Sequence, residues 1–119
     1  MLNDLSESRL NRLRAVLREH IPERLREHIQ IKKHDGERWA LYQKNEFDRI
    51  IVDAPCSGER HILQTPKELN VWSETRTKRL HTRQVSLVCS AFDALKPGGR
   101  MVYSTCSISD LENDQVVKK

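Results

Sequence analysis

Apolar residues near the start of the chain recur with a helical period. They are spaced three and four residues apart, on one face of a helix: Leu10, Leu13, Val16 and Leu17. Arginines are distributed around the remaining faces. The pattern predicts an amphipathic helix over about residues 6–19, with its start capped by Asp4 and Glu7 and its end near Pro22. A second, shorter helix is expected around residues 23–27.

Extended patterns come next along the chain. Residues 29–31 alternate like a short strand, and an Asp-Gly turn follows. Residues 47–53 form a β-branched apolar run, which is typical of a strand buried on both faces in a parallel sheet. Residues 100–104 predict a further strand. These segments alternate with helical ones, so the sequence predicts an α/β fold with a mostly parallel sheet.

The segments between the later strands differ strongly in pattern. The charged stretch 59–78 lacks a clear period and is expected to be an exposed surface excursion. Residues 80–95 have an apolar face and predict a helix, stopped by the Lys-Pro-Gly-Gly segment 96–99. Residues 111–119 begin a further helix. We find no internal repeat, so these elements are expected to form a single domain over 1–119.

Composition narrows the class of protein. With 119 residues the chain is long enough for one domain, and no run approaches the ~20 apolar residues of a membrane span. Because no secretory leader is visible and three cysteines make no disulfide framework, we expect a soluble protein in a reducing, intracellular compartment. A net charge of +4 fits a nucleic-acid partner without establishing one, since the charge is intermixed along the chain. The residues give no indication of oligomeric state.

Polar residues follow each predicted strand. Ligands of open α/β sheets bind outside the carboxyl ends of the strands, where these residues stand. They are Asp4, Asp35, Asp53 with Cys56, and Thr105 with Cys106. The sequence therefore predicts that two thiols and three carboxylates converge on one edge of the sheet.

Two of the three cysteines have the setting of a nucleophile. Cys56 and Cys106 stand in loops after strands, among small polar residues, where a thiol is exposed enough to react. Cys89 stands in an apolar helical run and is expected to be packed. A buried, unreactive thiol is the alternative for either loop cysteine. A zinc site is not indicated, because the chain has no Cys-x-x-Cys pair and no histidine spacing to match; a phosphate loop from Cys56 to Arg60 is too short.

The carboxylates Asp4 and Asp35 have two open interpretations. An acidic side chain just past a strand end commonly accepts hydrogen bonds from ribose hydroxyls or an adenine amine. A helix cap for Asp4 and a local Asp-Gly turn for Asp35 explain the same residues equally well.

Several segments together resemble one enzyme family. Residues 53–58 (Asp-Ala-Pro-Cys-Ser-Gly) and 96–107 (ending Ser-Thr-Cys-Ser) look like the paired cysteine signature of the Nop/Sun family of RNA cytosine-5 methyltransferases. Residues 3–9, 35–36 and 112–117 match further motifs of that family in the right order. The resemblance covers nearly the whole chain, and it implies part of a Rossmann-like class I methyltransferase sheet.

The resemblance also implies a covalent mechanism. Carbon 5 of cytosine is a poor nucleophile, so a thiolate first adds to carbon 6, after which carbon 5 takes the methyl group of S-adenosylmethionine. By the family's motifs, Cys106 is the nucleophile and Cys56 assists release of the methylated RNA. Asp53 would hydrogen-bond the cytosine edge, help to protonate the ring and lie close to the cofactor.

Cofactor, partner and location follow from the same resemblance. Asp4 and Arg9 would lie at the ribose of S-adenosylmethionine and Asp35 with Gly36 near its adenine, although Arg9 is also one of many basic residues on a solvated helix. The partner is RNA with an unpaired or flipped cytosine, and rRNA is favoured over tRNA. A bacterial cytoplasm is expected, with mitochondria as the alternative. The resemblance implies no metal.

The resemblance leaves one part of the family's domain unmatched. The first strand and the Gly-rich loop that family members carry before the residues matching Asp4 have no counterpart here. We therefore expect a partial catalytic domain with unpaired strand edges, weak cofactor binding and low stability. One alternative is a non-catalytic fragment that binds RNA or a partner protein through the basic stretch Arg76–Arg83, and another is a fragment with no independent function.

Overall fold

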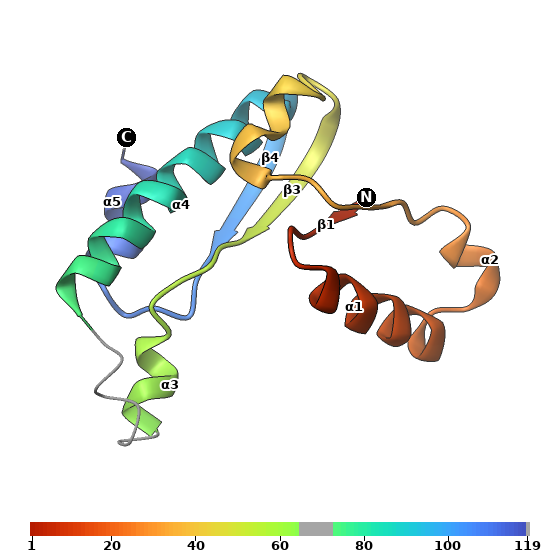
Figure 1. Ribbon diagram of the computed structural model, residues 1–119. Helices are drawn as coiled ribbons and strands as arrows, with labels where there is room; N and C mark the ends of the chain where they lie inside the picture. The colour runs from red at the N-terminus through yellow and green to blue at the C-terminus, as the bar shows by residue number, and fades with distance from the viewer. Residues whose placement is uncertain (65–72, 119) are drawn as a thin grey trace.

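Four strands form two separate parallel pairs in the computed structural model, which describes residues 1–64 and 73–118 (Figure 1). β1 (Leu2–Asn3) pairs with β2 (Ile31–Lys32). β3 (Phe47–Asp53) pairs with β4 (Leu95–Ser104). Parallel pairing joined through helices confirms the α/β class. The single sheet expected from the sequence is instead two ladders, with no strand between them in the described part of the chain.

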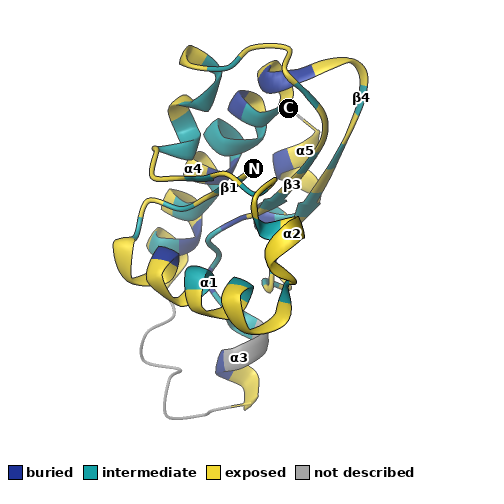
Figure 2. Ribbon diagram, turned by 90° about the vertical axis from the view of Figure 1, so that its right-hand side faces the viewer, coloured by how far each residue is buried: buried dark blue, intermediate teal, exposed yellow. Residues whose placement is uncertain are grey.

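Helices connect and cover these strands. They are α1 (Glu7–His20), α2 (Glu23–Arg26), the 3-10 helix η1 (Gly36–Leu41), α3 (Glu59–Gln64), α4 (Glu74–Ala94), the 3-10 helix η3 (Asp110–Glu112) and α5 (Asp114–Val117). The first two lie within about a residue of the ranges expected from the sequence. Figure 2 shows both largely exposed, although Leu10 of α1 is fully buried.

The start of α1 differs from the prediction. Its N-cap residue is Ser6, which makes no side-chain capping hydrogen bond. The Asp4 carboxylate instead accepts a hydrogen bond from the Ser6 backbone N–H at 2.7 Å, two residues along the chain. Capping by Asp4 and Glu7 is therefore wrong, because the chain turns sharply at Asp4 before the helix begins.

Helix α4 packs on one face of β3 and β4, with α5 against it (Figure 1). Alternate residues of each strand, such as Ile50 and Val52, are half-buried. The intervening Ile51 is 77% exposed and its register partner Val102 is 58% exposed. β3 is thus not buried on both faces as predicted, since nothing in the described part of the chain covers the second face.

The Lys-Pro-Gly-Gly segment ends α4 and also belongs to β4. Phe47 pairs with Leu95 and Arg49 pairs with Arg100, so β3 advances two residues while β4 advances five. The extra residues form a bulge, a position that tolerates a proline without an N–H donor. Lys96 crosses back from this bulge to the Asp48 carboxylate, with both N–O distances at 3.0 Å.

Three other segments depart from the prediction. Much of 59–78 is helical: α3 occupies its first part and α4 begins at Glu74, capped by Ser73, while residues 65–72 lie outside the described residues. The expected helix over 111–119 is two short helices, because Asn113 between them has a non-helical backbone (φ −116°, ψ −98°). β2 begins two residues after the start of the predicted strand 29–31.

Candidate active site at the ends of two parallel strands

The two loop cysteines meet where β3 and β4 end. Asp53 pairs in register with Ser104, and the Ala54 N–H donates to the Ser104 carbonyl at 3.0 Å, so both chains leave the sheet side by side. The Sγ atoms of Cys56 and Cys106 lie 2.7 Å apart, although 50 residues separate them. The Cys106 N–H also donates to Cys56 Sγ at 3.3 Å.

Asp53 lies at the same strand end. It is exposed, and its Oδ1 accepts a long hydrogen bond of 3.5 Å from the Ser104 hydroxyl. The structure therefore brings together the two thiols and one of the three predicted carboxylates.

The thiols affect each other's ionisation. The hydrogen bond with Cys56 raises the pKa of Cys106, and partial burial together with the negative charges of Cys56 and Asp53 raises it further. A raised pKa lowers the thiolate fraction near neutral pH. Cys106 is exposed, so a base can reach it, but it must lose its proton before it can act as a nucleophile.

A buried polar network lies beneath the two loops. Glu112 is fully buried, and its Oε2 accepts hydrogen bonds from the Ser57 N–H at 3.0 Å and from Gln84 Nε2 at 2.7 Å. Its Oε1 accepts from the Ser107 hydroxyl at 3.2 Å. Gln84 is also fully buried and donates to the Pro55 carbonyl at 2.9 Å. The network therefore joins both cysteine loops to α4.

Asn113 and Tyr103 complete the support on the Cys106 side. The Thr105 hydroxyl donates to Asn113 Oδ1 at 2.6 Å, and Asn113 Nδ2 donates to the carbonyls of Ser107 and Ser109 at 3.1 and 2.9 Å. The Tyr103 hydroxyl donates to the Glu112 carbonyl at 2.7 Å. Burial, with the charges of Glu112 and Cys56, raises the pKa of Tyr103 to about 12.

Sequence reasoning missed Gln84 and the role of Glu112. The signal for Gln84 was an amide within the apolar stripe of α4, four residues after Leu80 and before Val88. In the sequence Glu112 stands out only as part of the segment 112–117, because a lone glutamate near a helix start is usually a surface residue.

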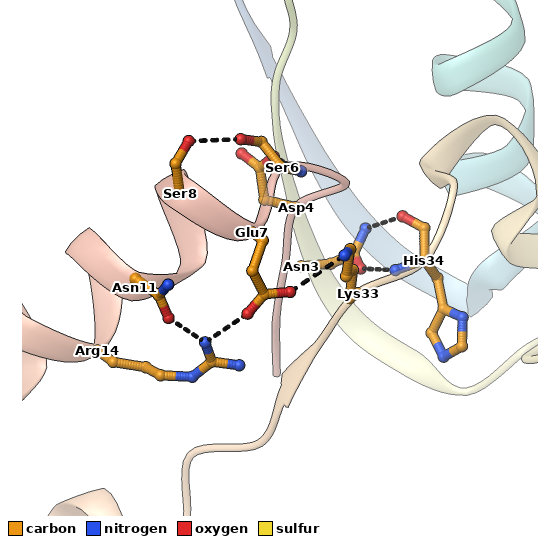
Figure 3. A network of polar contacts seen from close by, with 9 residues as sticks. All are labelled: Asn3, Asp4, Ser6, Glu7, Ser8, Asn11, Arg14, Lys33 and His34. Atoms are coloured by element: carbon orange, nitrogen blue, oxygen red, sulfur yellow. Dashed lines mark hydrogen bonds and ion pairs between the residues drawn. The ribbon is translucent and has the colours of Figure 1, made fainter.

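Asp4 and Asp35 lie at the ends of the other strand pair. Asn3 clamps these ends together: its Nδ2 donates to the His34 carbonyl at 3.0 Å and its Oδ1 accepts from the His34 N–H at 2.9 Å (Figure 3). Asp4 is half-buried, and its Oδ2 lies 3.6 Å from Arg9 Nη1. Arg9 is 71% exposed, so this ion pair is weak.

Asp35 and Gly36 also stabilise the local structure at the start of η1. Asp35 caps η1, its Oδ1 accepting from the Glu37 N–H at 3.1 Å, while its Oδ2 has no partner among the described residues. A Cβ on Gly36 would lie 2.9 Å from Leu87 Cδ2, so the glycine lets η1 approach α4 closely. The predicted site residues thus form two groups, one on each strand pair.

Cys89 is exposed, so its predicted packing is wrong. The residues of α4 that are buried include Gln84, Ser90 and Ala94, and the Ser90 hydroxyl accepts from the Ala40 N–H at 3.1 Å. Cys89 precedes Ser90 by one residue, about 100° around the helix, which turns it away from the buried face.

The basic stretch Arg76–Arg83 is partly neutralised. Lys78 pairs with Glu74 at 2.6 Å and Arg83 with Glu37 at 2.7 Å. His81 is used internally, with Nδ1 2.6 Å from the Leu111 carbonyl oxygen. These contacts weaken the interpretation of the stretch as a row of cations that tracks phosphates.

Two other features are absent from the described ranges. Residues 1–64 and 73–118 contain no group of three or more histidine, cysteine or acidic side chains placed to hold a metal ion. None of the helices in these ranges is long and apolar enough to cross a membrane.

Known proteins match the chain from end to end. The family model of the 16S rRNA methyltransferases RsmB/F matches residues 1–119. The mouse 5-cytosine rRNA methyltransferase NSUN4 is 40% identical over 121 residues, which cover 98% of this chain and 32% of that protein. The zebrafish mitochondrial tRNA (cytosine(34)-C(5))-methyltransferase is 37% identical over 119 residues, again 98% of this chain and 32% of the relative.

A solved structure shares the fold. NSun6 from Pyrococcus horikoshii, crystallised with SFG, superposes with a TM-score of 0.81 at 24% identity, over 98% of this chain and 28% of that one. The chain spans about a third of the length of the curated relatives named above. Because the family model matches the whole chain and the two cysteine loops of its signature are in contact, the chain belongs to the RsmB/F family of methyltransferases, within the Nop/Sun group of RNA cytosine-5 methyltransferases.

Proposed function

We propose that this chain carries the catalytic thiols of an RNA cytosine-5 methyltransferase, with Cys106 as the nucleophile. The observation that supports this most strongly is the 2.7 Å contact between Cys56 Sγ and Cys106 Sγ beside Asp53. Two thiols and a carboxylate at one strand end meet the needs of a reaction that forms and later breaks a bond to the base.

The residues divide the chemistry between them. The Cys106 thiolate adds to carbon 6 of an extruded cytosine, and the electron pair of the ring double bond moves toward carbon 5. Asp53 hydrogen-bonds the cytosine edge and helps to protonate the ring as the adduct forms. After methylation, carbon 5 loses its proton to solvent, the electron pair of that C–H bond restores the double bond, and Cys106 leaves as the thiolate. Cys56, in contact with Cys106 Sγ, is placed to assist this release.

The second strand pair supplies residues for S-adenosylmethionine, which when bound provides the methyl group. Asp35 has a half-buried carboxylate whose Oδ2 makes no hydrogen bond to any residue that the structure describes, and Asp4 lies at the neighbouring strand end. Carboxylates at the carboxyl ends of parallel strands fit the ribose hydroxyls and adenine amine of such a cofactor. We assign Asp4 and Arg9 to the ribose side, and Asp35 and Gly36 to the adenine side.

The substrate we propose is rRNA. The family model and the mouse relative are named for rRNA, while the zebrafish relative is named for a mitochondrial tRNA. The target cytosine must leave its stack to reach an exposed thiol. Both RNA classes therefore belong in the test.

Trapping with RNA that contains 5-fluorocytosine tests the proposal. Fluorine at carbon 5 blocks the final elimination, so a working nucleophile remains bonded to the base. We expect an adduct from the chain with S-adenosylmethionine and rRNA, lost in Cys106→Ser and retained in Cys56→Ser and in the control Cys89→Ser. Adducts that survive Cys106→Ser would refute the assignment. If mouse NSUN4 traps the same RNA and this chain does not, the chain does not carry the activity alone.

A further inference from the structure

Glu112 contacts the residue that follows each cysteine of the site. Its Oε2 accepts from the N–H of Ser57, next to Cys56, and its Oε1 accepts from the hydroxyl of Ser107, next to Cys106. The two serines also meet directly, with the Ser57 hydroxyl donating to Ser107 Oγ at 3.2 Å. One buried side chain therefore contacts both cysteine loops, in each case at the residue directly after the cysteine.

The surroundings of Glu112 are uncharged donors. Among the described residues its carboxylate is reached by a backbone N–H, a hydroxyl and the Gln84 side-chain amide. Burying a carboxylate lowers the stability of the fold unless donors satisfy its oxygens. The three donors must therefore stay close to the fully buried Glu112, which restricts where the groups that carry them can lie. Such an arrangement favours one geometry of the two loops over others.

The neighbouring Asn113 holds the Cys106 loop from both sides. It accepts from the Thr105 hydroxyl, one residue before Cys106, and donates to the Ser107 carbonyl, one residue after it. Glu112 and Asn113 are adjacent, so a shift of η3 would move both supports together. Of these two residues, Glu112 is the one that also reaches the Cys56 loop. A second carboxylate, Glu59, follows the Cys56 loop, and its Oε2 accepts from the Ser107 hydroxyl at 3.0 Å and from the Ile108 N–H at 3.2 Å.

We propose that Glu112 is a positioning residue that keeps the thiols of Cys56 and Cys106 in contact. This rests on the proposed function, because it assigns Glu112 a part in the same thiol pair. Glu112 touches neither thiol. It acts through Ser57 and Ser107, and its loss lets the two loops separate.

Glu112→Gln is the sharpest perturbation because it keeps the shape of the side chain. If the new amide nitrogen takes the place of Oε2, it faces the donors Ser57 N–H and Gln84 Nε2. If it takes the place of Oε1, it faces Ser107 Oγ, which already accepts from Ser57 Oγ and the Ser109 N–H. Either orientation places a donor against a group that cannot accept it well.

The measurement is the disulfide equilibrium of the whole chain with glutathione. In this reaction two protein thiols become one disulfide, and one glutathione disulfide becomes two glutathione thiols, so electrons balance without another oxidant. The Cys89→Ser background leaves Cys56 and Cys106 as the only thiols. The equilibrium constant is the effective concentration of one thiol at the other. The reaction is equilibrated well below the unfolding temperature and quenched with acid, and the oxidised and reduced forms are quantified by mass spectrometry.

We expect Glu112→Gln to lower this effective concentration at least tenfold, which raises the reduction potential by about 30 mV. The matched control is Asp110→Asn, an exposed carboxylate of the same 3-10 helix, and we expect no change there. A role in stability alone would lower the unfolding temperature of Glu112→Gln and leave its effective concentration equal to that of the parent. That result overturns the proposal.

Ser107→Ala gives a second test if Glu112→Gln does not fold. It removes the hydroxyl that links both Glu112 and Glu59 to the Cys106 loop and leaves the two carboxylates in place, and we expect a fall in the same direction. An unchanged value would overturn the proposal. The disulfide assay needs neither RNA nor S-adenosylmethionine. Its result can therefore be interpreted even if no RNA adduct forms, and the adduct experiment can be interpreted even if the disulfide equilibrium does not change.

Discussion

Gln84 offers the most direct measure of how much the buried network stabilises the fold. Its Nε2 donates to the Glu112 carboxylate at 2.7 Å and to the Pro55 carbonyl at 2.9 Å, whereas its Oε1 is buried without a partner. Replacement by leucine, a side chain of similar size, removes both hydrogen bonds and also removes the unpartnered oxygen.

The magnitude follows from these three terms. A hydrogen bond to a charged group contributes about 1.5–3 kcal/mol and a neutral one about 0.5–1.5 kcal/mol, while an unpartnered buried group costs about 1–3 kcal/mol. Since Gln84→Leu also leaves Glu112 Oε2 with the Ser57 N–H as its remaining donor and takes the Gln84 donor from the Pro55 carbonyl oxygen, we expect a net loss of about 2 kcal/mol. With about 2.1 cal/mol/K of unfolding entropy per residue, this lowers the Tm by roughly 8 °C.

Thermal unfolding followed by circular dichroism measures the effect. Arg79→Leu is the matched control, because Arg79 is exposed on the same helix and its replacement is expected to change stability by less than about 0.5 kcal/mol. A Gln84→Leu variant that unfolds within a degree of the wild-type chain would show that the loops do not depend on this amide. The energetic reading of the network would then be wrong.

Three further predictions concern single groups. Cys56→Ala should speed alkylation of Cys106 near neutral pH, because losing the hydrogen bond with Cys56 lowers the raised pKa of Cys106; an equal or slower rate by mass spectrometry would contradict this. The pKa of Tyr103 is raised to about 12 from 10, so the stability it contributes is complete below pH 10 and is lost as the pH rises through 12. Urea unfolding between pH 9 and 12 should show a smaller alkaline loss in Tyr103→Phe, and equal losses would count against the shift. Gly36→Ala should lower the free energy of unfolding by about 1 kcal/mol, because the new Cβ would lie 2.9 Å from Leu87 Cδ2. In a double-mutant cycle, Gly36→Ala should be nearly neutral in the Leu87→Ala background.

Local patterns in the sequence determined the elements and the loops that carry chemistry. The period of α1 and the β-branched run of β3 predicted those two elements within a residue or so at each end. The rule that ligands bind at the carboxyl ends of parallel strands selects Cys56, Cys106 and Asp53 from the sequence alone. It selects Asp4 and Asp35 equally, and the sequence does not show that these two lie on a separate strand pair. The resemblance to one family rested on the same loops.

The tertiary structure decided which of these residues touch and which are buried. The thiol contact joins positions 50 residues apart, and the burial of Gln84 and Glu112 depends on three elements packing on one another. Cys89 is exposed because it lies about 100° around α4 from the buried Ser90, and the apolar residues beside it in the sequence do not reveal which side of the helix is buried. Periodicity records which side chains share a face of one element, whereas a polar side chain becomes buried only when neighbouring elements supply its hydrogen-bond partners.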